Sequence, residues 1–401
     1  MTDTRQGRAW EVFLAFLKLG ISAFGGPVAH LGYFHTEFVE RRRWLDEGSY
    51  ADLVAVCQFL PGPTSSQVGI ALGLRRAGWP GALCAWLGFT LPSALLLVAF
   101  AYGITHHAGL ATSGAVQGLK IVAVAVVAQA VMNMARTLCP DRLRAGLALL
   151  AALIALALPW AAGQVGAMLI AGLLGRLLIE HAPLECSPQA AAASAGPGVS
   201  RRSAVLALGL FAGLLLGLPV VASTTGSAGW ALIDGFFRAG SLVFGGGHVI
   251  LPLLQAVVVP TGVVDNAQFL AGYGAAQAVP GPLTSFAAFL GTVAHGPLSG
   301  WSGGLVLLAV IFAPSFLLVA GVLPFWDALR QRAGIRPALA GINAGVVGIL
   351  LAALYDPVWT GAIHGRLDFG LGLAAFGLLV YGRLSPVIVV GLGALAGWAL
   401  G

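Results

Sequence analysis

The residues of this chain that are best suited to hold a ligand lie in two short motifs, each of which occurs twice. The first is FGGP at 24–27, with the copy FGGG at 244–247, and the second is QFLPGPTSS at 58–66, with the copy QAVPGPLTS at 277–285. Proline removes a backbone donor and glycine lets a ligand approach the backbone closely, so each motif predicts a break in a helix. The N–H groups freed at the start of the next helix, together with serine and threonine hydroxyls, attract an anion.

The predicted anion site combines these breaks with amide, imidazole and basic side chains nearby. Its candidate substrate-binding residues are Lys18, Gly25, Gly26, Gln58, Pro61, Gly62, Pro63, Thr64, Ser65, Ser66, Lys120, Arg238, Gly245, Gly246, His248, Gln277, Pro280, Gly281, Pro282, Thr284 and Ser285. Lys18 and Arg238 occupy equivalent places in the two copies, and Lys120 lies within an apolar segment, where a cation is costly. The alternatives are that Lys18 snorkels to the interface and that Asp234 neutralises Arg238. His30 and His248 each lie near a glycine-rich break, and each is a donor to the anion, a carrier of a coupled proton or a hydrogen-bonded structural histidine.

The elements that must position these residues are membrane helices. Only 9% of the 401 residues are charged and 58% are hydrophobic, whereas a soluble domain carries roughly 25% charged residues. This composition excludes a soluble enzyme, a disordered protein and a nucleic-acid binder with a basic face. It indicates a protein whose apolar surface lies in a lipid bilayer. Since a crossing helix needs about 20 apolar residues, we predict an all-α polytopic membrane protein with about thirteen transmembrane helices, some of them broken. The apolar segments lie near 10–34, 49–73, 81–103, 111–134, 145–160, 161–179, 204–222, 229–259, 266–293, 300–325, 338–355, 367–382 and 384–401.

The order of the motifs indicates an internal repeat at an offset of about 220 residues. LPSALLLVA at 91–99 and APSFLLVAG at 313–321 extend the match beyond the two breaks. Equivalent loops differ in charge, because HHAGLATSG has no arginine and DALRQRAGIRP has three. We therefore predict two repeats of inverted topology, as in secondary transporters. The predicted divisions are an N-terminal transporter repeat at 1–179, a cytoplasmic linker at 180–203, a connecting helix that inverts the second half at 204–222, and a C-terminal repeat at 229–401.

The distribution of basic residues predicts the orientation. With the N-terminus in the cytoplasm and every segment crossing, most arginines outside the spans fall on the cytoplasmic side, as the positive-inside rule requires. The run Arg41–Arg43 is the exception, and acidic residues flank it. Alternatively, the first two segments enter the membrane and return. We expect a cytoplasmic N-terminus and a periplasmic C-terminus.

The chain has no Walker loop, HExxH, GxSxG, paired Cys/His set or flavin fingerprint, and its four cysteines are scattered. We therefore expect no cofactor, no metal and no enzymatic activity. A carrier driven by an ion gradient or the membrane potential suits the sequence better than an ATP-driven pump.

At these motifs the chain resembles the chromate ion transporter family in its long two-domain form. The resemblance rests on FGGP with the following His30, on FLPGPTSSQVGIALG at 59–73, and on the degenerate copies FGGGH and VPGPLTS. The second copy departs from the first, with Gly247 in place of Pro27 and Leu283 in place of Thr64.

This resemblance implies a transporter of the bacterial inner membrane that exports chromate from the cytoplasm and so gives chromate resistance. It also implies that sulfate, a structural mimic, competes, and a homodimer is compatible with it. The residues alone imply only an anion carrier. A carrier for sulfate or another tetrahedral oxyanion is one alternative, and a membrane-bound chromate reductase is the alternative from another class.

Overall fold

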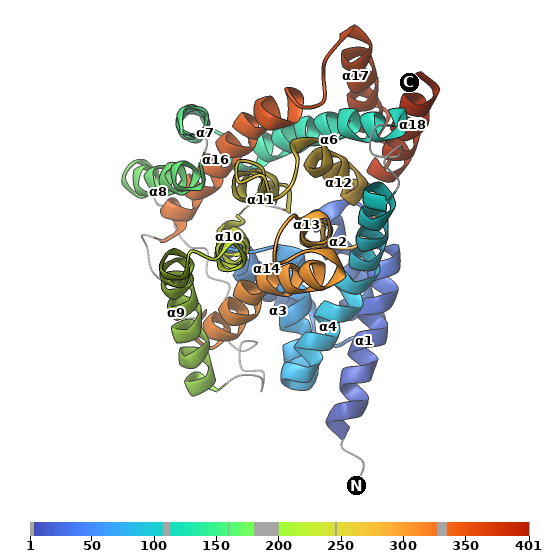
Figure 1. Cartoon of the computed structure of the whole chain (residues 1–401). Coiled ribbons are helices and arrows are strands. Elements are labelled where there is room, and N and C mark those ends of the chain that lie inside the picture. The colour runs from blue at the N-terminus through green and yellow to red at the C-terminus, as the bar shows by residue number, and fades with distance from the viewer. Residues whose placement is uncertain are drawn as a thin grey trace.

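The computed structural model describes residues 4–106, 113–158, 160–179, 200–244, 247–326 and 335–400. All regular elements within these ranges are helices (Figure 1). In chain order they are α1 (Thr4–Ser22), α2 (Gly26–His35), η1 (Thr36–Arg41), α3 (Glu47–Phe59), α4 (Thr64–His106), α6 (Gly114–Leu138), α7 (Arg142–Ala157), α8 (Ala161–Leu178), α9 (Arg201–Thr225), α10 (Ala228–Leu242), η3 (Gly247–Val249), α11 (Ile250–Val258), α12 (Asn266–Ala278), η4 (Leu283–Ser285), α13 (Phe286–Val293), α14 (Gly300–Val322), η5 (Leu323–Phe325), α16 (Ile335–Ala353), η6 (Leu354–Trp359), α17 (Arg366–Val380) and α18 (Pro386–Leu400).

Five helical stretches in the described part of the chain are long and apolar enough to cross a bilayer. They are α4, α6, α9, α14 together with η5, and most of α16 together with η6. Shorter apolar helices pack around them, and the predicted class, an all-α polytopic membrane protein, is confirmed. Helix α4 bends at Ala77 and Gly78, where the backbone leaves the helical region. Helix α4 therefore contains the end of the segment predicted at 49–73 and the whole of the segment predicted at 81–103.

The first two apolar segments fold as hairpins rather than as crossing helices. Phe16 of α1 lies beside Phe34 of α2, with 5.4 Å between the ring centroids. Glu11 near the start of α1 pairs with Arg42, which follows η1, at 3.5 Å, and with Arg76 of α4 at 3.1 Å. The hairpin of α1 and α2 and the hairpin of α3 with the first part of α4 therefore both open at one end of the protein, which we call the Glu11 end.

The corresponding segments of the second half are hairpins that open at the other end. Gly235 of α10 faces Val257 of α11, and Gly272 of α12 faces Phe289 of α13, so each pair of helices runs antiparallel. The backbone N–H of His295, after α13, donates to the carbonyl of Val263, after α11, at 2.8 Å.

A contact at the end of α4 shows at which end of the molecule these second-half hairpins open. The hydroxyl of Tyr102, near the end of α4, accepts from the backbone N–H of Trp301 at the start of α14, at 3.0 Å. We call this the Tyr102 end. The first part of α4 reaches the Glu11 end at Arg76, and the rest of α4 runs from there to the Tyr102 end. The first-half hairpins and the second-half hairpins therefore open at opposite ends of the protein.

The halves are therefore inverted, and five helical stretches among the described residues are long and apolar enough to cross, fewer than the thirteen predicted. The segments predicted to cross at 10–34, 49–73, 229–259 and 266–293 each turn back at the break. The physical reason is length: α3 has 13 residues and α13 has 8, which span about 20 Å and 12 Å at 1.5 Å per residue, whereas the hydrocarbon core is about 30 Å thick. The sequence placed Arg41–Arg43 across the membrane from the N-terminus unless the first segment returns. Because Arg42 pairs with Glu11 and lies at the same end as Arg76, the structure supports the alternative of a returning segment.

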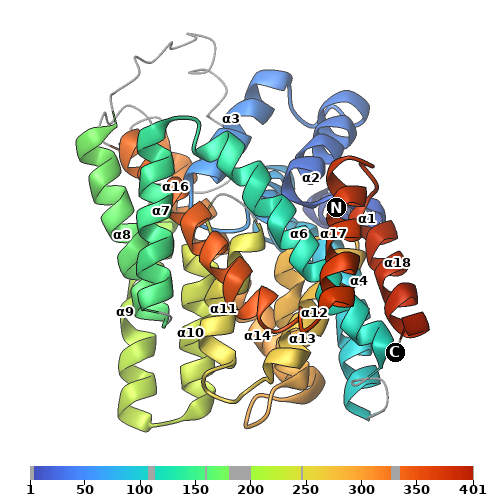
Figure 2. The same cartoon turned by 90° about the horizontal axis from the view of Figure 1, so that it is seen from above.

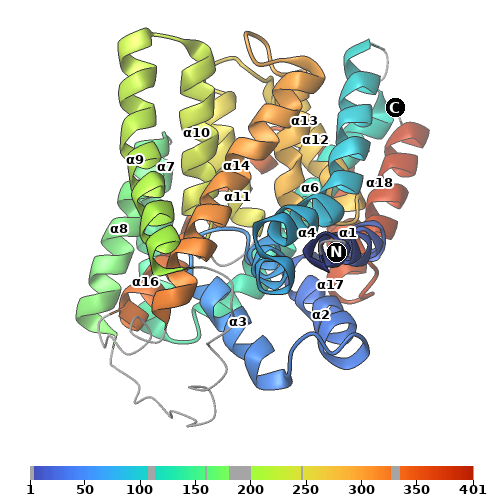
Figure 3. The same ribbon diagram turned by 90° about the horizontal axis from the view of Figure 1, so that it is seen from below.

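Packing around the hairpins is also similar in the two halves. Helix α1 packs along α4, and α10 packs along α14 (Figures 1 and 3). Helix α9, which begins at Arg201 rather than at 204, lies at the edge beside α10. The last two segments form a further hairpin, in which α17 and α18 both pack on α6 (Figure 2). Most of the predicted linker at 180–203 lies outside the described residues.

Candidate anion site

The tips of the four hairpins meet in the interior, and glycine and proline shape each tip. Gly25 has φ of 100°, and α2 begins directly after it with Pro27 in its first turn. Gly62 and Gly281, the centres of the two PGP motifs, have φ of 134° and 100°. These backbone conformations favour glycine strongly. The predicted breaks are therefore present at FGGP and at both PGP motifs, whereas Gly245 and Gly246 lie outside the described residues.

Two backbone hydrogen bonds join the tips of opposite halves in the same way. The N–H of Gly62 donates to the carbonyl of Val243 at 2.6 Å, and the N–H of Gly281 donates to the carbonyl of Ala23 at 3.0 Å. Ala23 and Val243 are equivalent residues of the repeat, as are the two glycines. Each half therefore holds the tip of the other half by the same contact.

The motifs at 91–99 and 313–321 also contact the PGP break of the opposite half. A side chain added at Gly281 would lie 3.0 Å from the hydroxyl of Ser93, and one added at Gly62 would lie 3.0 Å from the hydroxyl of Ser315. Both serines are fully buried. The third motif of the repeat thus packs against the PGP break of the opposite half, which explains why the three motifs occur together.

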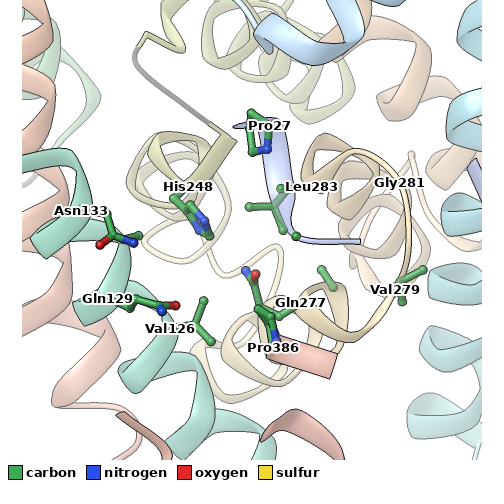
Figure 4. A pocket seen from close by; sticks show the side chains of 14 residues that line it. Pro27, Val126, Gln129, Asn133, His248, Gln277, Val279, Gly281, Leu283 and Pro386 are labelled. Atoms are coloured by element: carbon green, nitrogen blue, oxygen red, sulfur yellow. The ribbon is translucent and has the colours of Figure 1, made fainter. Parts of the chain in front are cut away.

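A cavity of about 150 Å³ lies beside the tips, with polar side chains directed toward it (Figure 4). It is bordered by the α1–α2 break, by the break and flanking residues of α12 and η4, by one face of α6, and by the start of α18. The lining residues are Gly25, Gly26, Pro27, Val126, Gln129, Ala130, Asn133, His248, Ala276, Gln277, Val279, Gly281, Leu283 and Pro386. Arginine, lysine, aspartate and glutamate do not occur among these described lining residues.

The polarity of this cavity suits an anion without any full charge. Helix α2 starts at the cavity with no side-chain cap, so its first N–H groups and its positive dipole end are available there. Gln129, Asn133 and Gln277 contribute amide groups. The Nε2 atom of Gln277 is buried and has no partner among the described residues. His248 contacts the hydroxyl of Tyr273 through Nδ1 at 2.9 Å, which leaves Nε2 for the cavity.

The hydroxyl residues of the first PGP motif lie beside this cavity rather than in it. Ser65 and Ser66 are buried at the start of α4, and the Ser65 hydroxyl contacts Nδ1 of His30 at 3.3 Å. The Ser66 hydroxyl and Nε2 of His30 have no partner among the described residues. Gln67, which the sequence analysis did not single out, donates to the carbonyl of Pro61 at 2.7 Å and so closes the break.

In the second copy, the hydroxyls are committed to the backbone or enclosed. Ser285 donates to the carbonyl of Pro282 at 2.7 Å, and Thr284 is buried. The copies also differ at the glutamine, because Gln277 lines the cavity while Gln58 is exposed. Of the predicted polar side chains, the structure therefore brings His248 and Gln277 together in the cavity.

The three predicted cations lie outside it. Lys18 pairs with Glu37 at 3.2 Å and its side chain is 58% exposed. Arg238 pairs with Asp234 at 2.7 Å, which is the alternative that the sequence suggested. Lys120 is half-buried in α6 and does not line the cavity.

Sequence reasoning missed the face of α6 that borders the cavity. Gln129 and Asn133 are four residues apart and therefore lie on one helix face, and a pair of amides at this spacing within the apolar segment predicted at 111–134 is a signal that could have been used. Val126, Ala130 and Pro386 carried no such signal, because only the packing of α6 and α18 on the hairpin tips places them there.

Helical hairpins that enter from opposite ends, with broken tips around a polar cavity, are the arrangement typical of membrane transporters with inverted repeats. The family model described as "Chromate transporter" matches residues 10–176 and again 230–398, and the chain belongs to this family. It is 31% identical over 97% of its length to a chromate transport protein of Pseudomonas aeruginosa, covering 91% of that protein. It is 30% identical over 96% to a probable chromate transport protein of Synechococcus elongatus, covering 89% of it, and 26% identical over 95% to a chromate transport protein of Cupriavidus metallidurans, covering 90%. No solved structure matches the chain.

Proposed function

We propose that the chain is a secondary transporter that exports chromate from the cytoplasm and thereby gives chromate resistance. The observation that carries this proposal is the cavity between the hairpin tips, where neutral donors and the start of α2 converge. Chromate is a tetrahedral dianion with acceptor oxygens on every face, so amide N–H groups and a helix N-terminus can bind it from several directions. Membership of the chromate transporter family supports this choice of substrate.

Transport requires the cavity to open alternately to each side, and the exchanged tip contacts suit that task. The first-half tips are reached from the Glu11 end and the second-half tips from the Tyr102 end. The hydrogen bonds from Gly62 and Gly281 join the tips of opposite halves at equivalent points. We infer that moving one pair of hairpins against the other breaks one of these contacts at a time, and so exposes the cavity to one side.

The basic residues support a cytoplasmic Glu11 end in a bacterial inner membrane. Because the first two segments return, Arg41–Arg43 join Arg75 and Arg76 on the side of the N-terminus, and the exception to the positive-inside rule disappears. The described helices that are long and apolar enough to cross number five, an odd number, which supports a C-terminus in the periplasm.

Sulfate is the second candidate, because the cavity offers donors that recognise a tetrahedral dianion and nothing specific to chromium. We expect sulfate to compete with chromate. The enzymatic alternative, a chromate reductase, finds no support in the lining residues, which include no cysteine among those described.

The test is uptake of radiolabelled chromate into everted membrane vesicles that contain the protein. Export from the cell corresponds to uptake into these vesicles, and a tenfold excess of sulfate should slow it. Total Cr(VI) should stay constant. Conversion of Cr(VI) to Cr(III) by the purified protein, or the same chromate uptake in vesicles without the protein, would refute the carrier.

A further inference from the structure

A second cavity, of about 340 Å³, lies where the tip of the α7–α8 hairpin meets α11 and the end of α16. Its lining residues are Ala155, Leu156, Trp160, Gln164, Pro252, Gln255, Ala256, Pro260, Ile349, Ala352, Ala353, Asp356 and Pro357. Pro260 belongs to the loop that follows α11, so this cavity lies toward the Tyr102 end. We propose that it binds a small inorganic monovalent cation. The proposal does not depend on which anion the first cavity takes.

The first support is the set of oxygen atoms that face this space. Gln164 is buried, and its Nε2 donates to the carbonyl of Pro252 at 3.3 Å. Since that contact fixes the amide orientation, Oε1 points the other way, and it has no partner among the described residues. Asp356 adds a carboxylate, whose Oδ1 accepts from the hydroxyl of Thr360 at 3.1 Å. An amide oxygen and a carboxylate that line the same cavity are ligands of the kind that hard cations take.

The second support is the direction of the helices. Helices α7 and α11 end at the cavity, at Ala157 and Val258, so both direct the negative ends of their dipoles there. Helix α16 is interrupted at the same place, because Asp356 has φ of −128° and ψ of 117° and Pro357 has no N–H. Helix α8 begins nearby and its positive end offsets one of these contributions. The net field favours a cation, and no lysine or arginine occurs among the described lining residues to supply one.

The two cavities therefore have opposite polarity, and α11 connects them. The short helix η3, which carries His248, leads directly into α11, so the positive end of α11 lies toward the anion cavity. Pro252, Gln255 and Ala256 of the same helix line the second cavity. Since a water molecule takes up about 30 Å³ in the liquid, the second cavity has room for a cation with part of its hydration shell.

The experiment titrates the purified full-length protein in lipid nanodiscs with NaCl against choline chloride at constant ionic strength. Two signals are followed, the tryptophan fluorescence, to which Trp160 at the cavity contributes, and the melting temperature, which a bound ligand raises. We expect both to change saturably with Na⁺ but not with choline. KCl is titrated in parallel, and a saturable response to either alkali cation supports the proposal. The absence of a response to both would overturn it.

Matched variants locate the site. Asp356→Asn should weaken the apparent Na⁺ affinity about tenfold or more, the loss expected for one charged ligand. Asp265→Asn, another exposed aspartate in a described loop at the same end, should leave the affinity unchanged. Equal Na⁺ affinities in the two variants would refute the proposed site.

Gln164→Lys provides a test that does not rely on disrupting the fold. The lysine can still donate to the Pro252 carbonyl, and its ammonium group would occupy the cavity in place of the free ion. We expect this variant to keep a melting temperature at least equal to that of the wild type without Na⁺, and to lose its response to Na⁺. A normal Na⁺ response in Gln164→Lys would contradict the assignment.

Discussion

The substitution Gly281→Ala tests whether the exchanged contact between the halves controls the anion cavity. Gly281 has φ of 100°, and its N–H donates to the carbonyl of Ala23. An alanine Cβ would lie 3.0 Å from both the carbonyl oxygen of Phe89 and the hydroxyl of Ser93. Either the tip or these atoms of α4 must therefore give way, which disturbs the packing around the hydrogen bond to Ala23.

The size of the effect follows from the backbone. A left-handed conformation costs an L-residue about 1–2 kcal/mol relative to glycine. If this cost falls on the tip conformation that forms the cavity, the equilibrium between this conformation and others shifts away from it by about 5- to 30-fold. We therefore expect the apparent chromate affinity of Gly281→Ala to fall by about that factor, measured as concentration-dependent uptake into everted vesicles at matched protein level.

The control is Gly226→Ala. Gly226 caps the C-terminus of α9 with φ of 59°, and nothing lies within 4 Å of the position that its Cβ would take. This variant therefore has similar backbone strain at a distance from the cavity, and it should lower the melting temperature without changing the affinity. Wild-type affinity in Gly281→Ala, or an equal loss of affinity in Gly226→Ala, would refute the role of the tip contact.

Three further outcomes are expected. Gln277→Leu should weaken chromate transport by about 10- to 150-fold, the loss of one charge-assisted hydrogen bond of about 1.5–3 kcal/mol, while Gln58→Leu should leave it near wild type, and equal effects would contradict the assigned cavity. Lys18→Gln should change the apparent affinity less than about twofold, because the exposed Nζ pairs with Glu37 outside the cavity, and a large loss would move the site toward Lys18. Epitope tags inserted after residues 107 and 334 should report opposite sides of the membrane, and two tags on one side would remove the inverted arrangement.

The sequence was sufficient to locate the breaks but not to show the direction of the chain after them. A helix of about 20 residues and two short helices joined by a glycine or proline break have the same apolar length. The turn back at Gly25 becomes visible only through contacts between distant residues, such as Phe16 with Phe34 or Glu11 with Arg42. The exception at Arg41–Arg43 was the one local sign of a returning segment.

The repeat, in contrast, was predictable because its motifs consist largely of glycine and proline, which have strong backbone preferences. Glycine and proline at equivalent places determine equivalent backbone conformations, and Gly62 and Gly281 confirm this with φ of 134° and 100°. The cations were not predictable in the same way, since the sequence shows a charge but not its partner. Glu37, which lies in η1, pairs with Lys18 only because the chain turns back after α1.

These pairs bear on how a carrier can handle a dianion. A lysine or arginine in the cavity would bind the dianion strongly and would have to be neutralised after its release, because an uncompensated charge is costly within a membrane. Here Lys18 and Arg238 are each paired with an acid away from the cavity. The cavity instead offers amides, an imidazole and a helix N-terminus, which are partial charges that need no counter-ion when the site is empty. A site of this kind can be emptied at either side of the membrane at a similar cost, which is what a reversible carrier between two aqueous phases requires.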